Sequence, residues 1–406
     1  MNHESNLGAK YSKRTVGNQR YIAPGYFNKI IIGVIALFFL GVTYYYAFHK
    51  PPASTNSSIK SDQSQELRSY IALAKQHGKI PKIQDYISSN MHNLVINGAD
   101  FSNVDFTGVD LSRSEFSDVQ FNGADLSAAN LSSIKCTRCD FTNARLHGAY
   151  MQGAVFIESI ARNAEFNDSI MSFTNLGSSD FGSSNMQNCD LTESNMQYSN
   201  FNKANLSKAN MLSANLTKAN LSEANLSEAN LFGANMNSGN LQNANLDGAY
   251  MEAVNLSDAN LTNSLLNRVV MNNANFSFAI FDDAKLENIN LVDSYGYKAS
   301  FKNAVISKAF VSGADLRETD FSNANAEGSD FSKADFTKSN CTNINMHHTR
   351  LVSTNFTSSV LNYSNLSGSI FINTILSNAQ TKDVKGLKAS TEALEDKHNV
   401  AAAPKK

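Results

Sequence analysis

The chain has 406 residues, contains no Trp and only five Pro, and carries a formal net charge of −2. Length alone allows two or three domains, and the abundance of Asn and Ser would be typical of a disordered chain if their order were random. The order is regular, because every fifth residue from Ile96 to Leu376 belongs to one column that is almost entirely apolar. This regularity excludes disorder and indicates a repeat protein.

The N-terminus has the features of a membrane anchor. Residues 1–29 form a basic tail with five Lys or Arg against one Glu, and Ile30–Phe48 has no charge in 19 residues. As a helix this segment spans about 28 Å, close to the roughly 30 Å of a bilayer core. Tyrosines at both ends are typical of aromatic belts, and the basic tail favours a cytoplasmic N-terminus. We expect an uncleaved single-pass helix in a bacterial inner membrane, with the remaining chain on the periplasmic side. A cleaved signal peptide and a buried soluble helix are the alternatives.

Three shorter segments complete the chain outside the repeat. Residues 49–65 are rich in Pro and Ser and predict a flexible linker. Residues 66–93 show helical spacing of apolar residues and predict a helical pair that caps the first coil. Residues 381–406 are expected to form a C-terminal cap with a short helix and a Lys-ended tail.

Residues 94–380 form the repeat itself. Of the 57 central positions, 49 are Leu, Phe or Met, each preceded by Asn or Asp in many copies and, two residues before, by a small residue. A period of five fits neither a helix nor a flat strand. The unit Ala204-Asn205-Leu206-Ser207-Lys208 resembles the pentapeptide-repeat family. The resemblance implies an all-β solenoid, a right-handed four-sided parallel β-helix of about 14 coils, with the central and small residues inward. At about 4.8 Å per coil the rod is roughly 65–70 Å long, and outward Asn residues are expected to stack as amide ladders.

Catalysis and metal binding find little support in the sequence. The repeat region holds three His residues, and the adjacent pair His347-His348 is expected to point apart in an extended chain. We see no acid–base pair, phosphate-binding loop or metal motif, and we expect no enzyme activity, cofactor or metal. Cys136 and Cys139 resemble a redox motif, but the repeat phase places both in the core. A disulfide between them is the alternative.

The outward residues distinguish the four sides of the predicted helix. We number the faces by their central residues: face 1 contains Phe101, face 2 Phe106, face 3 Leu111 and face 4 Phe116. Next to the central residues, face 3 carries 11 large apolar side chains in 28 outward positions, against three, two and five on faces 1, 2 and 4. Scattered apolar surface residues are common, but this clustering favours a docking surface. The candidate partner-binding residues are Tyr150, Ile170, Leu212, Phe232, Tyr250, Val270, Val292, Phe310, Val352, Ile370 and Ile372, with Phe173 at the third outward position.

One central position lacks its side chain. Gly296, between Tyr295 and Tyr297, stands where a large core residue is expected. Three outcomes are open: a tyrosine turns inward, the wall bulges to shape a binding site, or neighbouring side chains fill the space.

These observations favour a membrane-anchored interaction scaffold without catalysis, whose partner is another protein or a second copy bound through face 3. Two alternatives come from the family resemblance: a DNA-like protein that protects type II topoisomerases, and a secreted bacterial effector acting at host membranes. Residues 91–380 hold 17 basic and 28 acidic residues, and the flanks 17 basic and 8 acidic. We therefore expect no nucleic-acid partner for the repeat region.

Overall fold

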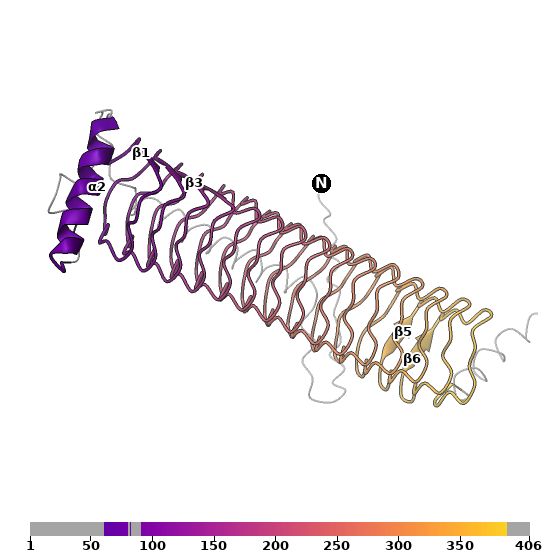
Figure 1. Cartoon of the computed structure of the whole chain (residues 1–406). Helices are drawn as coiled ribbons and strands as arrows, with labels where there is room; N and C mark the ends of the chain where they lie inside the picture. Colours follow the sequence, from indigo (N-terminus) through magenta and orange to yellow (C-terminus); the bar gives the residue numbers. More distant parts are fainter. Residues whose placement is uncertain (1–60, 80–81, 83–90, 388–406) are drawn as a thin grey trace, which may run out of the picture. The chain divides into compact units, whose positions relative to one another are not determined.

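The computed structural model describes residues 61–79, 82 and 91–387. These residues form helix α2 (Ser61–Gln76) and then a parallel β-solenoid of about 14 turns. Figure 1 shows the coils following one another along the axis, with α2 across the N-terminal end. The prediction of an all-β parallel solenoid is confirmed.

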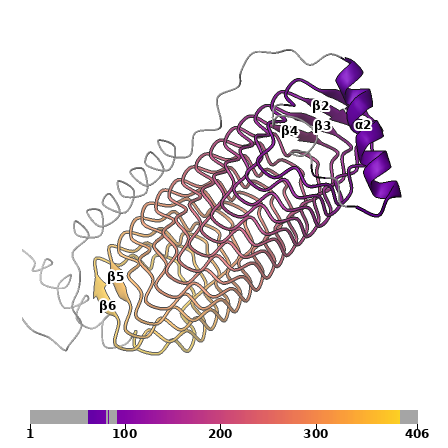
Figure 2. The same ribbon diagram turned by 90° about the vertical axis from the view of Figure 1, so that its left-hand side faces the viewer.

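The coils pair in register every 20 residues. Six short segments are extended enough to form parallel strands, in sheets of order β1-β2-β3-β4 and β5-β6. Figure 2 shows the first sheet beside α2. The strands are β1 (Val95–Asn97), β2 (Glu115–Ser117), β3 (Lys135–Thr137), β4 (Val155–Ile157), β5 (Arg350–Val352) and β6 (Ile370–Ile372). Elsewhere single bridges join residues 20 apart, so that four pentapeptides make one coil.

One repeat illustrates how the backbone is satisfied. The N–H of Leu206 donates to the carbonyl of Asn225 in the next coil at 2.7 Å, and the N–H of Asn225 donates to that of Ala204 at 2.9 Å. Within the turn, Ala209 donates to Leu206 at 3.1 Å. Leu206 and Ala204 are fully buried. Both predicted inward columns are therefore confirmed, and hydrogen bonds between coils hold the solenoid along its length.

The third outward position controls each turn. Every residue in this column from Asn93 to Asp383 has a left-handed backbone, with φ between 52° and 64° where it is not Gly. A left-handed φ after an ordinary turn residue, closed by a bond between residues three apart, describes a type II turn. Val, Ile and Thr are absent from the whole column, because branching at Cβ makes this conformation costly.

Amide ladders run along the outside, as the sequence predicts. Asn220 donates its side-chain N–H to Asn200 at 2.9 Å, and Asn240 donates to Asn220 at 3.1 Å. The Asn220 oxygen also accepts the backbone N–H of Ser222 at 3.2 Å. Where Asp joins such a ladder it lies at the N-terminal end, because it can only accept. These Asp–Asn pairs are Asp110–Asn130, Asp180–Asn200, Asp190–Asn210, Asp320–Asn340 and Asp335–Asn355.

Helix α2 covers the first coil. Leu67 and Ile71 are buried on one side of the helix and join the solenoid core. Arg68 donates to the carbonyl of Asn97 at 2.7 Å, and Lys75 pairs with Asp100 at 3.0 Å. The helix thus protects apolar core and unpaired backbone at the open end.

The observed boundaries differ slightly from the expected ones. Helix α2 begins at Ser61, inside the expected linker, and the solenoid already includes Met91 and extends to Lys385. Within the described ranges, no helix is long and apolar enough to cross a membrane. The segment Ile30–Phe48, the second half of the expected cap (residues 83–90) and the tail 388–406 lie outside the described residues.

Candidate functional site

The 20-residue register brings the face 3 candidates together in two neighbouring columns. The first column, one residue before the centre, is a continuous row of backbone bridges from Asp110 to Ile370. It contains Tyr150, Ile170, Tyr250, Val270, Phe310 and Ile370. The second column lies just after the centre and contains Leu212, Phe232, Val292, Val352 and Ile372. The shared face predicted for these residues is thus present in the structure.

Their exposure varies along the face. Four side chains are about half exposed, namely Phe173, Phe310, Ile370 and Ile372, and Phe232 is 37% exposed. Six are partly exposed: Tyr150, Leu212, Tyr250, Val270, Val292 and Val352. Ile170 differs from the expectation, because it is buried at 5% exposure and adds little to the surface.

The middle of face 3 carries a fixed aromatic pair. The rings of Phe232 and Tyr250 lie 5.9 Å apart at an interplanar angle of 13°. The Tyr250 hydroxyl donates to Glu252 Oε2 at 2.5 Å. Burial, together with this carboxylate, raises the pKa of Tyr250 well above its usual range. The pair therefore offers a neutral, pre-ordered apolar platform.

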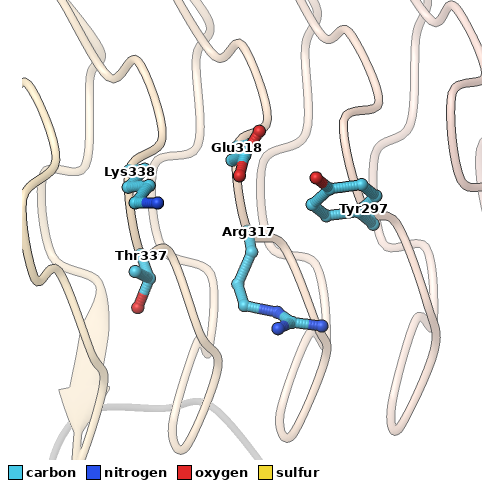
Figure 3. A pocket seen from close by; sticks show the side chains of 5 residues that line it. All are labelled: Tyr297, Arg317, Glu318, Thr337 and Lys338. Atoms are coloured by element: carbon cyan, nitrogen blue, oxygen red, sulfur yellow. The ribbon is translucent and has the colours of Figure 1, made fainter.

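Face 4 holds a hollow that the sequence analysis did not identify. It has a volume of about 280 Å³ and is lined by Tyr297, Arg317, Glu318, Thr337 and Lys338 (Figure 3). Arg317 lies over the Tyr297 ring at 5.8 Å, and two hydrogen bonds of 2.7 and 2.8 Å hold it to Asp315. The run of aromatic and basic residues after Gly296 was the available signal, but it extends over successive coils and becomes visible only at a spacing of 20.

Gly296 is explained by a neighbour in the core. A Cβ at this position would lie 2.0 Å from the ring of Phe276, so that this ring occupies the missing volume. The Gly296 N–H still bonds the carbonyl of Asp315 at 2.8 Å, and Tyr295 stays 58% exposed. Filling by a neighbouring side chain is confirmed, while an inward tyrosine and a bulged wall are wrong.

The cysteines are core residues and free thiols. Cys139 Sγ donates to the carbonyl of Phe116 in the preceding coil at 3.6 Å. Ser159 Oγ makes the equivalent bond to the carbonyl of Cys136 at 3.3 Å. Cys139 thus replaces a structural serine, and burial raises the pKa of the Cys136 thiol. A buried, protonated pair gives no support to redox catalysis.

The expectation that His347 and His348 point apart is wrong. Their ring centroids lie 3.8 Å apart, because the left-handed backbone of His348 bends the chain at the corner. His347 Nδ1 also lies 3.6 Å from Glu327. Even so, the described part of the chain holds no group of three or more His, Cys, Asp or Glu residues placed to bind a metal ion.

Comparison with known proteins identifies the repeat. No curated protein matches the chain. Among solved structures, a pentapeptide repeat protein from the Arabidopsis thaliana thylakoid lumen is 29% identical, covering 24% of this chain and 69% of its own, with a TM-score of 0.24. QnrB1, a plasmid-mediated fluoroquinolone resistance protein, is 17% identical over 49% of this chain and 94% of its own, with a TM-score of 0.22. HetL, a pentapeptide repeat protein involved in heterocyst differentiation regulation in the cyanobacterium Nostoc, is 20% identical over 74% and 94%, with a TM-score of 0.16.

With TM-scores this low, the family assignment rests on the sequence model of the repeat. The model for pentapeptide repeats matches residues 95–132, 134–172, 174–211, 214–252, 254–292, 299–337 and 339–378. These segments make up more than half of the chain and follow the coils described above. The chain therefore belongs to the pentapeptide-repeat family.

Proposed function

We propose that this protein is a non-enzymatic scaffold that binds another protein through face 3 of its solenoid. The observation that carries the proposal is the concentration of large apolar side chains on that face. Face 1 has only Ile160, Ile280 and Val360 in the equivalent positions, and face 2 only Leu265 and Val305. Clustered apolar groups on a rigid surface are typical of protein-binding sites.

The surface chemistry favours binding over catalysis. Side chains at equivalent positions stand side by side along an axis, and a reaction needs groups that converge in a concave site. The face 4 hollow is open, and its Arg317 is already neutralised by Asp315. Stiffness is the property the coils provide, since each is bonded to both neighbours through the backbone.

We further propose that Ile30–Phe48 anchors the scaffold in the bacterial inner membrane, with the solenoid on the periplasmic side. The support is the uncharged 19-residue run and the basic tail before it. Tethering to a membrane raises the effective concentration of the scaffold near membrane partners. A topology reporter fused to the C-terminus tests this orientation, and a cytoplasmic signal would contradict it.

The DNA-like alternative receives less support from the surface. Many carboxylates are paired with bases, as in Glu115–Lys135 at 2.7 Å and Asp125–Arg145 at 2.8 Å. The middle coils carry neutral Asn ladders in place of acidic rows. A cytoplasmic solenoid in the topology experiment would revive this alternative, as would protection of a topoisomerase in vitro. The secreted-effector alternative keeps the same surface and changes only the compartment.

The face itself is tested by replacing Tyr150, Phe232, Tyr250 and Phe310 with Ser. All four side chains point outward, so we expect the far-UV β signal to be retained while partner capture is lost. The matched control replaces Ile280 and Val360 on face 1 with Ser, and this variant should bind normally. Unchanged capture by the face 3 variant would refute the proposal.

A further inference from the structure

The apolar residues of face 3 follow a symmetric order. Twelve consecutive coils lie between the coil of Tyr150 and the coil of Ile370, and ten of them carry a large apolar side chain on this face. The two exceptions are the coils of Asp190 and Asp330. One is third from the N-terminal end of the series and the other is third from its C-terminal end. The series therefore reads alike in both directions, with its midpoint between Tyr250 and Val270.

From this order we propose that face 3 binds a second copy of the chain, packed face to face and antiparallel about a two-fold axis at that midpoint. The inference rests on the proposed function, because it names the occupant of the same surface. A two-fold interface requires one patch to be complementary to itself. A rotation about an axis across the rod reverses the order of coils and keeps each outward column opposite the same column.

The opposed side chains fit each other in size. Tyr250 meets Val270, and Phe232 meets Val292, each within one column. Farther from the axis, Tyr150 meets Ile370 of the other copy. The bulky aromatic groups thus face smaller aliphatic ones, as close packing between two flat faces requires.

The two polar coils also meet each other, and their corner charges are opposite. Glu193 faces Lys333 in the left-handed column, where both side chains are exposed. Asp190 faces Asp330, but each is already stabilised in its own copy. Asp190 accepts hydrogen bonds from its own turn, and Asp330 lies 3.7 Å from Arg350. The apolar order and the charge pairing therefore select the same register.

Other arrangements fit the face less well. In a parallel dimer Glu193 would meet Glu193, and the large ring of Tyr250 would meet its own copy. An extended peptide cannot add to face 3 as a strand, because the backbone there is already used. Tyr250 donates to Ala229 at 2.9 Å, and Met251 donates to Val270 at 2.7 Å. Recognition must come from side chains, which in this face are self-complementary.

The first test measures the mass of the full-length chain in detergent by light scattering. We expect twice the 44.3 kDa of one chain, and a monomer for the variant carrying Phe232→Ser, Tyr250→Ser and Phe310→Ser. The control variant Ile280→Ser/Val360→Ser should stay dimeric. A wild-type chain that is monomeric at all concentrations would overturn the proposal.

Cross-linking tests the antiparallel register. Gln152 and Asn373 are eleven coils apart in one chain but fall on opposed coils in the proposed dimer. A copy carrying Gln152→Cys should therefore cross-link through a short bis-maleimide to a differently tagged copy carrying Asn373→Cys. Cross-linking of Gln152→Cys to itself would indicate a parallel pair and contradict the register. The four native cysteines are buried and serve as an internal background.

Charge exchange tests the interface without altering any apolar residue. Lys333→Glu creates two repulsive pairs in the dimer and should raise its dissociation constant about tenfold. Adding Glu193→Lys should restore the wild-type value. Failure of this rescue would contradict the pairing. If the chain is monomeric yet the face 3 variant still loses a membrane partner, the dimer is refuted and the scaffold function stands.

Discussion

Replacing Asn220 with Asp tests whether the direction of the amide ladders stabilises the solenoid. Asn220 donates to Asn200 at 2.9 Å and accepts from Asn240 at 3.1 Å. A carboxylate keeps the accepting role but places two acceptor oxygens against each other on the N-terminal side. Losing the hydrogen bond costs about 1 kcal/mol, and the unsatisfied Asn200 oxygen about 1 kcal/mol more. We expect the variant to lose about 2 kcal/mol of unfolding free energy at pH 7.

The same variant should recover at low pH. Because its neighbours only accept, the folded state should raise the pKa of the new carboxyl group. The stability it contributes is then present in the protonated form at low pH and lost as pH rises through the folded pKa. Thermal unfolding between pH 3 and 7 and amide hydrogen exchange of the flanking coils measure this effect. Asn243→Asp is the control, since its side chain is exposed in the left-handed column. Equal stability of Asn220→Asp and wild type at pH 7 would refute the reasoning.

Three further predictions concern the core. Gly296→Leu should cost about 1–3 kcal/mol in chemical denaturation through overpacking against Phe276, and adding Phe276→Leu should restore much of that loss. Cys139→Ser should preserve stability, since Ser159 makes the equivalent bond one coil on. Cys136→Ser should cost about 1–3 kcal/mol by burying a hydroxyl group. Burial raises the pKa of Cys189 to about 12. Its stabilising contribution is thus complete below about pH 9 and falls by about 1.4 kcal/mol per pH unit above it; Cys189→Ala should flatten that alkaline loss.

The sequence predicted the solenoid well because its spacing repeats without interruption. The phase of the central column also located both inward positions, the core role of Cys136 and the empty centre at Gly296. It could not show what fills that centre, because the answer depends on how the ring of Phe276 packs from the preceding coil. The His347-His348 prediction was wrong for a related reason: it assumed an extended chain at a corner with a left-handed backbone.

Two features missed at first do have signals in the sequence. The left-handed column lacks Val, Ile and Thr throughout, a restriction that points to the turn geometry. The face 4 hollow, by contrast, combines Tyr297, Arg317 and Lys338 from successive coils. Adjacency across coils is fixed by the 20-residue register, but the way Arg317 bends toward Asp315 and Tyr297 depends on side-chain conformation. Burial of Ile170 likewise could not be inferred from its outward position.

The most direct test of the interaction surface is photo-cross-linking in intact bacterial cells. A photoreactive residue is placed at Phe232 on face 3 or, as the matched comparison, at Ile280 on face 1; the two side chains are 37% and 39% exposed. We predict an adduct of about twice 44.3 kDa from position 232 that contains only this chain, and none from position 280. Equal adducts from both positions, or no adduct from position 232, would contradict the assignment of face 3 as the docking surface.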